Sequence, residues 1–318
     1  MKRVFALALV LVMAMGLCVS AQATTYLALG TGGTSGTYYA LGADIAALWM
    51  ANIEDLDVTV QPTDASKDNI IFIQDGEIDL ATVQNDAMAY AYEGNEFYGN
   101  EVFDGFYAMG TLYPEAVQCV VAASSDILTI ADLKGKNVSV GAQGSGTYMN
   151  AEQILAAGGL TMEDINPQYL SFAESATAFQ DGQIDAAFLT SGVPNTAIVE
   201  ITTKQPVRVL APSEEEWQFL NENYKFYVPY TIPAGTYDGM TEDASVPAVM
   251  ATLIVSRDAD EELVYELTKV LFEKTDELTH AKKAEISAEA AVNGVPTPFH
   301  PGAARYFAEL GLEVEVGE

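Results

Sequence analysis

The sequence repeats itself once, and this duplication constrains the fold more than any other feature. The tetrapeptide Ser-Gly-Thr-Tyr occupies residues 35–38 and occurs again at 145–148. The hexapeptide Gln-Asp-Gly-Glu-Ile-Asp at 74–79 recurs, with one change, at 180–185. Both matches occur in the same order and at nearly the same offset, 110 and 106 residues. A solenoid needs three or more copies, so a single duplication predicts two lobes built on one plan.

Strand and helix patterns alternate within both copies. We expect strands at 26–29, 58–61, 80–83, 137–140, 168–170 and 186–189, and helices at about 38–50, 66–74, 148–157 and 175–180. This alternation predicts a parallel-type α/β sheet in each lobe. The fold class expected is therefore α/β, a two-lobed architecture with a ligand cleft between the lobes.

The remaining segments extend the two lobes. Apolar runs at 106–112 and 117–122, split by Tyr-Pro-Glu, predict a pair of strands that crosses between them. The turn residues Pro233, Gly235 and Gly239 predict a connector over 230–240 that returns the chain to the first lobe. Further strands are expected at 207–210 and 249–255, and helices at 213–223, 260–274 and 302–310. We place lobe one at 24–114 and 240–318, and lobe two at 115–239.

The N-terminus has the pattern of a signal peptide. Lys2 and Arg3 precede an apolar run over 4–19, which is followed by an Ala-Gln-Ala site that ends at Ala23. The run is short for a membrane-spanning helix, so a retained anchor is the less favoured alternative. We expect residues 1–23 to be removed and the mature protein to be periplasmic. Cleavage removes Cys18, which leaves Cys119 without a partner for an intrachain disulfide.

The charge balance excludes several classes of partner. Asp and Glu number 45 against 14 Lys and Arg, which gives a formal net charge of −31. Cleavage at Ala23 lowers it to −33, since only Lys2 and Arg3 are lost among charged residues. Nucleic acid and anionic lipid both need clustered positive charge, so neither is an expected partner. Two Cys and two His are too few for a Cys/His zinc site, and we expect no metal and no cofactor.

A glycine-rich loop follows the first strand of each copy, at 31–37 and 143–147. Such loops present backbone N–H groups at the positive end of a helix, where they bind an anion without help from Lys or Arg. The alternative is a tight turn whose Ser and Thr side chains only cap the helix. The duplication favours ligand contact, because both loops then face one cleft and suit a small carboxylate.

Polar residues also follow the third strand of each copy, where ligands bind in open α/β sheets. Gln84, Asn85 and Ser191 either hydrogen-bond a ligand or cap the next helix, and both interpretations stay open. Asp86 is expected to be a cap, and one of Tyr38 and Tyr39 to wall the cleft while the other packs in the core. The candidate ligand-binding residues are Thr31, Gly32, Gly33, Thr34, Tyr38, Gln84, Asn85, Ser145, Gly146, Thr147, Ser191, Gly192 and Val193.

The sequence offers little support for catalysis. His280 and His300 lie outside both loops, and the chain contains no Gly-x-Ser-x-Gly motif. Asp79 and Asp185 occupy equivalent places in the two copies, which favours a scaffold role over a catalytic pair. We therefore predict a binding protein without catalytic residues; an enzyme on the same fold is the less favoured alternative.

Motifs along nearly the whole mature chain resemble the TAXI family, the TRAP-associated extracytoplasmic immunogenic solute-binding proteins of TRAP transporters. The motifs are Gly-Thr-Gly-Gly at 30–33 with Tyr38 and Tyr39, Gly-x-x-Asp-x-Ala-x-x-Gln-x-Asp at 76–86, Asp-Leu-Lys-Gly-Lys at 132–136, Gly-Ser-Gly-Thr at 144–147, Gly-Val-Pro at 192–194, Ile-Pro-Ala-Gly-Thr-Tyr at 232–237 and His-Pro-Gly-Ala at 300–303. The resemblance implies a type II periplasmic binding-protein fold and a cleft between the glycine-rich loops. It also implies delivery of a small organic acid or amino acid, such as glutamate or 2-oxoglutarate, to an ion-gradient-driven TRAP permease.

The dicarboxylate-binding branch of TRAP proteins clamps its ligand with an arginine, and this chain departs from that pattern. The mature arginines Arg208, Arg257 and Arg305 all lie outside the cleft motifs. Carboxylate recognition is then left to backbone N–H groups and hydroxyls. We expect a monomer whose partners are its ligand and the permease subunits; a receptor of an ATP-driven (ABC) importer is the alternative.

Overall fold

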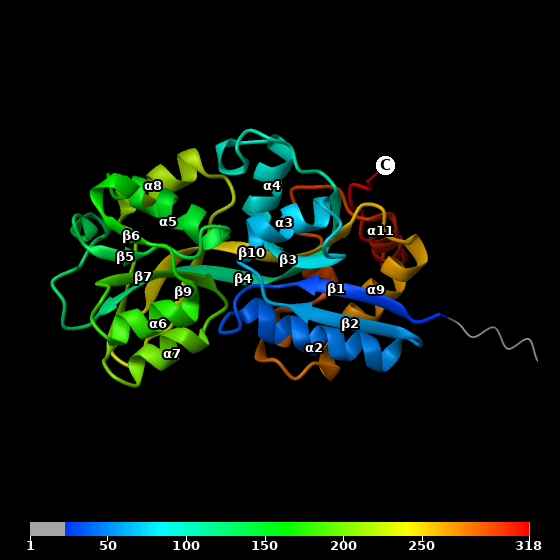
Figure 1. The fold of residues 1–318 in the computed structure, drawn as a ribbon, viewed down its shortest axis with the longest axis horizontal. Helices are drawn as coiled ribbons and strands as arrows, with labels where there is room; N and C mark the ends of the chain where they lie inside the picture. Colours follow the sequence, from blue (N-terminus) through cyan, green and yellow to red (C-terminus); the bar gives the residue numbers. More distant parts are fainter. Residues whose placement is uncertain (1–22, 318) are drawn as a thin grey trace, which may run out of the picture.

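The computed structural model describes residues 23–317, which form two lobes joined by long shared strands (Figure 1). The expected signal peptide lies outside the described residues, apart from Ala23. Within residues 23–317, no helix combines the length and the hydropathy that crossing a bilayer requires.

The strands are β1 (Thr25–Gly30), β2 (Leu56–Gln61), β3 (Leu80–Gln84), β4 (Phe106–Ala122), β5 (Asn137–Ser139), β6 (Asn166–Gln168), β7 (Ala186–Ser191), β8 (Val207–Leu210), β9 (Val228–Ile232) and β10 (Ala244–Ser256). The α-helices are α2 (Thr37–Asn52), α3 (Ser66–Gln74), α4 (Asn85–Glu93), α5 (Gly146–Ala157), α6 (Phe172–Gln180), α7 (Thr196–Thr202), α8 (Glu214–Asn223), α9 (Glu261–Glu273), α10 (Ala288–Ala291) and α11 (Pro301–Glu309). Short 3₁₀ helices occupy η1 (Glu96–Tyr98), η2 (Ile130–Leu133), η3 (Met162–Asp164), η4 (Thr275–Glu277) and η5 (Ala281–Glu285).

The strands form one mixed sheet, whereas the sequence predicted a separate parallel sheet in each lobe. Its order is β2-β1-β3-β10-β4-β7-β5-β6, with β8 paired to β4 and β9 to β10. β1 pairs in parallel with β2 and β3, and β5 pairs in parallel with β6 and β7. The two groups are continuous because β4, of 17 residues, and β10, of 13, run antiparallel through both lobes. The expected residue bounds of the lobes, 24–114 with 240–318 and 115–239, stay predictions.

β4 is a single strand, and the prediction of a pair split at 113–115 was wrong. Pro114 lies opposite Met250 of β10, whereas the pairing of β4 with β7 reaches only Ala116, opposite Ser191. Proline lacks an N–H group and is tolerated where a strand has a ladder on one side only. The proline therefore marks the crossing between the lobes without ending the strand.

The predicted connector over 230–240 also differs from the structure. Residues 228–232 form β9, which pairs with β10 within the second lobe. Ile232, Tyr237 and Met240 are buried in that lobe's core. Because these apolar side chains hold the segment in place, the chain returns to the first lobe along β10 instead.

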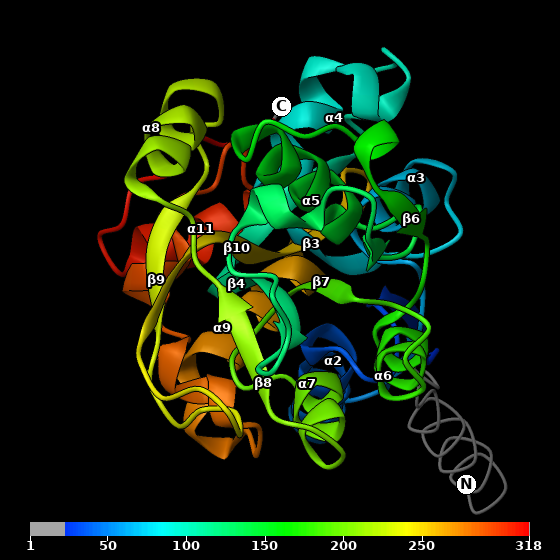
Figure 2. The same ribbon diagram turned by 90° about the vertical axis from the view of Figure 1, so that its left-hand side faces the viewer.

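The cores lie between the sheet and its helices. Trp49 of α2 is fully buried in the first lobe, and its Nε1 donates to the Leu267 carbonyl of α9 over 2.8 Å. In the second lobe, Phe188 and Leu189 of β7 belong to separate apolar clusters. Successive strand residues point to opposite faces, so each face has its own core. Figure 2 shows the corresponding helix layers, with α5 and α8 on one side and α6 and α7 on the other.

The two copies of the duplicated sequence make equivalent hydrogen bonds. Asp79 Oδ2 accepts a hydrogen bond from the Ala28 N–H, and Asp185 Oδ2 accepts one from the Asn137 N–H, both over 2.8 Å. Each carboxylate thus ties the start of its own third strand to the first strand of the same copy. The scaffold role predicted for this pair is confirmed.

Candidate functional site

A cavity lies between the lobes, where β4 and β10 cross. The empty space within its lining, open mouth included, is about 560 Å³. Both lobes line it, through Gly32, Gly33, Gly36, Thr37, Tyr38, Thr63, Asp64, Ala65, Ser66, Gln84 and Glu115 along the first lobe and the crossing strand, and Ala142, Ser145, Gly146, Thr147, Ser171, Phe172, Thr190 and Ser191 in the second. None of these lining residues is Lys or Arg.

The N-terminal ends of four helices, α2, α3, α5 and α6, meet at this cavity. The residues that precede α2 and α3, Gly36 and Ala65, make no side-chain cap hydrogen bond. By contrast, Ser145 caps α5 by accepting from the Tyr148 N–H over 3.1 Å. The first-turn N–H groups of α2 are thus left for another acceptor, at the positive end of a 16-residue helix. This arrangement suits a small anion.

The floor of the cavity carries acceptors from the crossing strands. Gln84 pairs with Ala251 of β10, and Glu115 pairs with Val249. The two partners are two residues apart on one strand, so Gln84 and Glu115 project from the same face of the sheet. Both side chains are buried, with exposed fractions of 3% and 2%. Within the described residues, Gln84 Oε1 has no hydrogen-bond partner.

Glu115 is tied to the first lobe by one strong hydrogen bond. The Tyr38 hydroxyl donates to Glu115 Oε2 over 2.5 Å. Burial raises the pKa of Glu115 well above its usual range, and the nearby Asp86 adds to this rise, while the Tyr38 hydrogen bond and Lys282 oppose it. The carboxyl group is therefore held in the cavity wall without a direct positive partner, because Lys282 Nζ is engaged by Glu285 Oε1 at 2.6 Å.

Direct contacts close the lobes on each other around the cavity. The Lys67 N–H at the start of α3 donates to the Gly144 carbonyl of the second lobe over 3.1 Å. Asn150 of α5 donates to Asp86 of α4 over 2.9 Å, and both side chains are buried. A Cβ on Gly146 would meet the end of the buried Gln84 side chain from the other lobe, so a larger residue there requires Gln84 to move. The conformation described is closed.

Eight of the predicted ligand-binding residues line the cavity: Gly32, Gly33, Tyr38, Gln84, Ser145, Gly146, Thr147 and Ser191. Thr31 is fully buried, and its Oγ1 donates to the Gln61 carbonyl over 2.8 Å. Asn85 ties α4 to the opposite segments, donating to the Gly294 carbonyl over 2.9 Å and accepting from the Met250 N–H over 3.0 Å. Ligand contact by each of the predicted residues stays a prediction.

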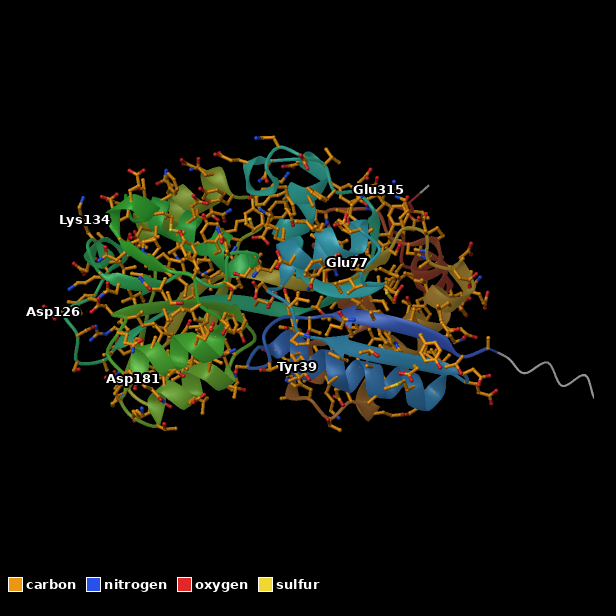
Figure 3. All side chains as sticks on the ribbon, viewed as in Figure 1. Tyr39, Glu77, Asp126, Lys134, Asp181 and Glu315 are labelled. Atoms are coloured by element: carbon orange, nitrogen blue, oxygen red, sulfur yellow. The ribbon has the colours of Figure 1, made fainter. Side chains whose placement is uncertain are left out.

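The other predicted residues lie beside the cavity. Thr34 lines a neighbouring hollow between the α3 and α6 regions. Gly192 packs near Thr37 and Lys282, and Val193 packs against the second-lobe core. Of the tyrosine pair, Tyr38 both walls the cavity and belongs to the first-lobe core. Tyr39 is half-buried outside that core, near the junction of the lobes (Figure 3).

Several lining residues were missed by the sequence analysis. The duplication could have predicted some of them, because the loops before α3 and α6 are equivalent in the two copies. Both loops line the cavity, through residues 63–66 in the first lobe and residues 171 and 172 in the second. Glu115 gave no local signal, because its position depends on the crossing of β4 between the lobes. The missed residues are Gly36, Thr37, Thr63, Asp64, Ala65, Ser66, Glu115, Ala142, Ser171, Phe172 and Thr190.

The residues considered for catalysis have structural roles. His280 Nδ1 accepts from the Lys282 N–H over 3.1 Å, and His300 Nδ1 accepts from the Gly302 N–H over 3.2 Å, so each caps a helix. Cys119 is buried, which raises the pKa of its thiol far above the usual range. Among residues 23–317, no group of three His, Cys, Asp or Glu side chains could hold a metal ion.

A two-lobed α/β fold, with a cavity at the junction that both lobes line, is the architecture of periplasmic solute-binding proteins. The chain belongs to the NMT1-like family, which it matches over residues 29–311. This match supports the general class expected from the sequence but does not separate out the TAXI family.

The chain is also similar to individual proteins. The chain is 29% identical over 189 residues to an aliphatic sulfonates-binding protein of Escherichia coli (strain K12), a match that covers 58% of this chain. It spans only about half of that protein, 48% of its length. A solved structure from Bordetella bronchiseptica RB50 has a TM-score of 0.55 at 20% identity and covers 90% of this chain and 80% of its own. The alkanesulfonate-binding protein SsuA from Xanthomonas axonopodis pv. citri, bound to MOPS, has a TM-score of 0.49 at 21% identity, covering 91% and 85%.

Proposed function

We propose that this chain is an extracytoplasmic solute receptor that captures a small organic acid in the cavity between its lobes. The observation that carries this proposal is the uncapped N-terminus of α2, which opens into a cavity lined by both lobes and by no Lys or Arg. Backbone N–H groups at such an end stabilise a carboxylate or a sulfonate. The neighbouring hydroxyls of Thr37 and Thr147 are further donors.

Capture follows a hinge mechanism. A ligand that contacts both lobes adds binding free energy only to the closed state, so it shifts the population from open to closed. β4 and β10 are the natural hinge, because they are the long strands that pass from one lobe to the other. No step of this cycle breaks a covalent bond of the solute, which is why we assign a receptor and not an enzyme.

We further propose where the receptor is located and which transporter it serves. The signal-peptide pattern and the TAXI motifs support a periplasmic receptor that delivers its solute to a TRAP permease. The alternative is a receptor for an ABC importer of sulfonates, which the likeness to the Escherichia coli aliphatic sulfonates-binding protein favours. A neighbouring gene for a fused multi-spanning permease supports the first assignment, and one for an ATPase supports the second.

A thermal-shift screen of the mature chain, residues 24–318, tests the capture step. Small carboxylates, amino acids and sulfonates are the probes, and calorimetry then measures the stoichiometry of each hit. A ligand that binds only the folded state must raise the melting temperature. We expect at least one probe to do so and to bind with 1:1 stoichiometry. A screen in which no small acid shifts the melting temperature would contradict the proposal.

A further inference from the structure

The cavity has two chemically different ends. The uncapped start of α2 supplies N–H donors, which bind an anion. The floor supplies acceptors, the Glu115 carboxyl group and the Gln84 carbonyl oxygen, both within the same lining. An organic acid that carried only its anionic group would satisfy the donors and leave the Gln84 oxygen without a donor.

A buried acceptor in the cavity floor that lacks a hydrogen-bond donor destabilises the folded state. Gln84 Oε1 is buried and has no partner among the described residues, and such an orphaned acceptor costs stability. Glu115 is 2% exposed, and the groups that act on its pKa are Tyr38, Asp86 and Lys282. Tyr38 donates one hydrogen bond to it, Asp86 adds negative charge, and Lys282 is paired with Glu285. Burial therefore favours the neutral form of Glu115, and no cationic side chain among the described residues is hydrogen-bonded to it, so a bound cation would stabilise the ionised form.

We infer that the solute carries an amine, and that Glu115 is the residue that selects for it. This inference rests on the proposed function. The solute is then a zwitterion, either an amino acid or an aminosulfonate. Its anionic group lies at the start of α2, and its ammonium group donates to Glu115 and to the free oxygen of Gln84. The acceptors of the floor and the charge of Glu115 are satisfied together only in the loaded, closed state.

Calorimetry with matched pairs of probes tests this inference. Each pair differs by the amine alone: alanine and propionate, glutamate and glutarate, taurine and ethanesulfonate. In the wild type we expect the amine of at least one pair to improve binding about tenfold or more, as for a hydrogen bond to a charged group. The alanine and glutamate pairs carry carboxylates and the taurine pair carries sulfonates, so comparing them shows which anionic group the cavity binds.

Substitution at the floor then locates the effect. Glu115→Gln keeps the shape and removes the charge, so the preference for the amine should be lost. Gln84→Met should weaken the preference in the same direction, and it covers the case in which Glu115→Gln does not fold. Glu152→Gln removes a charge from the exposed side of α5 and is the matched control, which should keep the preference.

The outcomes separate this inference from the proposed function. Amine-free acids that bind the wild type as tightly as their amine partners would overturn the inference and leave the receptor function standing. A Glu115→Gln protein that folds and keeps the full preference would also overturn it. If no member of any pair binds, the receptor function fails, and the inference fails with it.

Discussion

Asn150 of the second lobe donates a hydrogen bond to Asp86 of the first lobe over 2.9 Å, with exposed fractions of 0% and 1%. Asn150 also donates to the Tyr227 hydroxyl over 3.1 Å and accepts from the Thr190 hydroxyl over 2.9 Å. Thr190 is itself a lining residue of the cavity. The polar network that joins the lobes is therefore continuous with the wall of the proposed binding site.

This contact predicts a specific pH dependence. Burial raises the pKa of Asp86 to about 7, from an ordinary value of 3.8. The folded state then binds a proton that the unfolded state releases, so stability present below pH 4 is lost as the pH rises to about 7. Three pH units correspond to at most about 4 kcal/mol. Glu115 shifts in the same direction, since burial raises its pKa as well.

Asp86→Asn isolates this contribution. The variant cannot ionise, and its single side-chain oxygen replaces the two that accept from Asn150 and from the Ala87 N–H. Whatever its overall stability, it should lose the pH dependence between about pH 4 and about pH 7. Urea unfolding at several pH values measures the difference. Equal pH dependence in the two proteins would show that Asp86 does not titrate with a raised pKa.

Gly146→Ala should hold the lobes apart. The new Cβ would meet the end of the Gln84 side chain from the opposite lobe; this side chain is only 3% exposed, and overpacking of a buried group costs about 1–3 kcal/mol. We expect a larger radius of gyration by small-angle X-ray scattering and weaker ligand binding. The double variant Gly146→Ala with Gln84→Ala removes the collision, so its radius should return to that of the wild type. A single variant as compact as the wild type would contradict this prediction.

Thr37→Pro removes one of the proposed donors from the backbone. Thr37 is the first residue of α2, a position where proline fits a helix but carries no N–H group. Loss of a hydrogen bond to an anion should weaken binding about tenfold or more. Thr37→Val loses the hydroxyl and keeps the N–H, so it serves as the control. If both variants bind equally, the N–H of Thr37 makes no contribution.

Salt should strengthen the binding of a net anionic probe such as glutarate. The mature chain carries a formal charge of −33 once Lys2 and Arg3 are removed from the −31 of the full sequence. This field repels an anion at long range, and screening shortens its reach to about 10 Å at 0.1 M salt. Calorimetry from about 0.05 M to about 0.5 M NaCl should show rising affinity. An affinity that collapses over this range would contradict the prediction.

Elements set by local patterns were predictable from the sequence. The bounds of α3 and β8 coincide with the predicted ranges 66–74 and 207–210, because capping residues, turns and apolar periodicity act within a few residues. The duplication also located both glycine-rich loops of the cavity. The structure contains these helices, strands and loops where they were predicted because interactions between residues close in the sequence determine them.

Features that depend on distant contacts were not predictable. Tyr38 and Glu115 are 77 residues apart in the chain and meet only when β4 crosses between the lobes. Asp86, expected as a helix cap, accepts from the Ala87 N–H in the first turn of α4 and also bridges to Asn150, 64 residues away. The continuous β4 follows from its pairing with β10, which offsets the local tendency of Pro114 to end a strand. Tertiary pairing, and not local propensity, decides such positions.

Native mass spectrometry of the mature chain tests the central claim most directly. The protein, as purified and after incubation with the acids of the screen, should carry one small acid per chain. Ala142→Phe places a ring into the cavity from a half-buried loop position, so this variant should fold and carry none. A wild-type chain that takes up no small acid, or an Ala142→Phe chain that carries the same acid equally well, would contradict a binding site between the lobes.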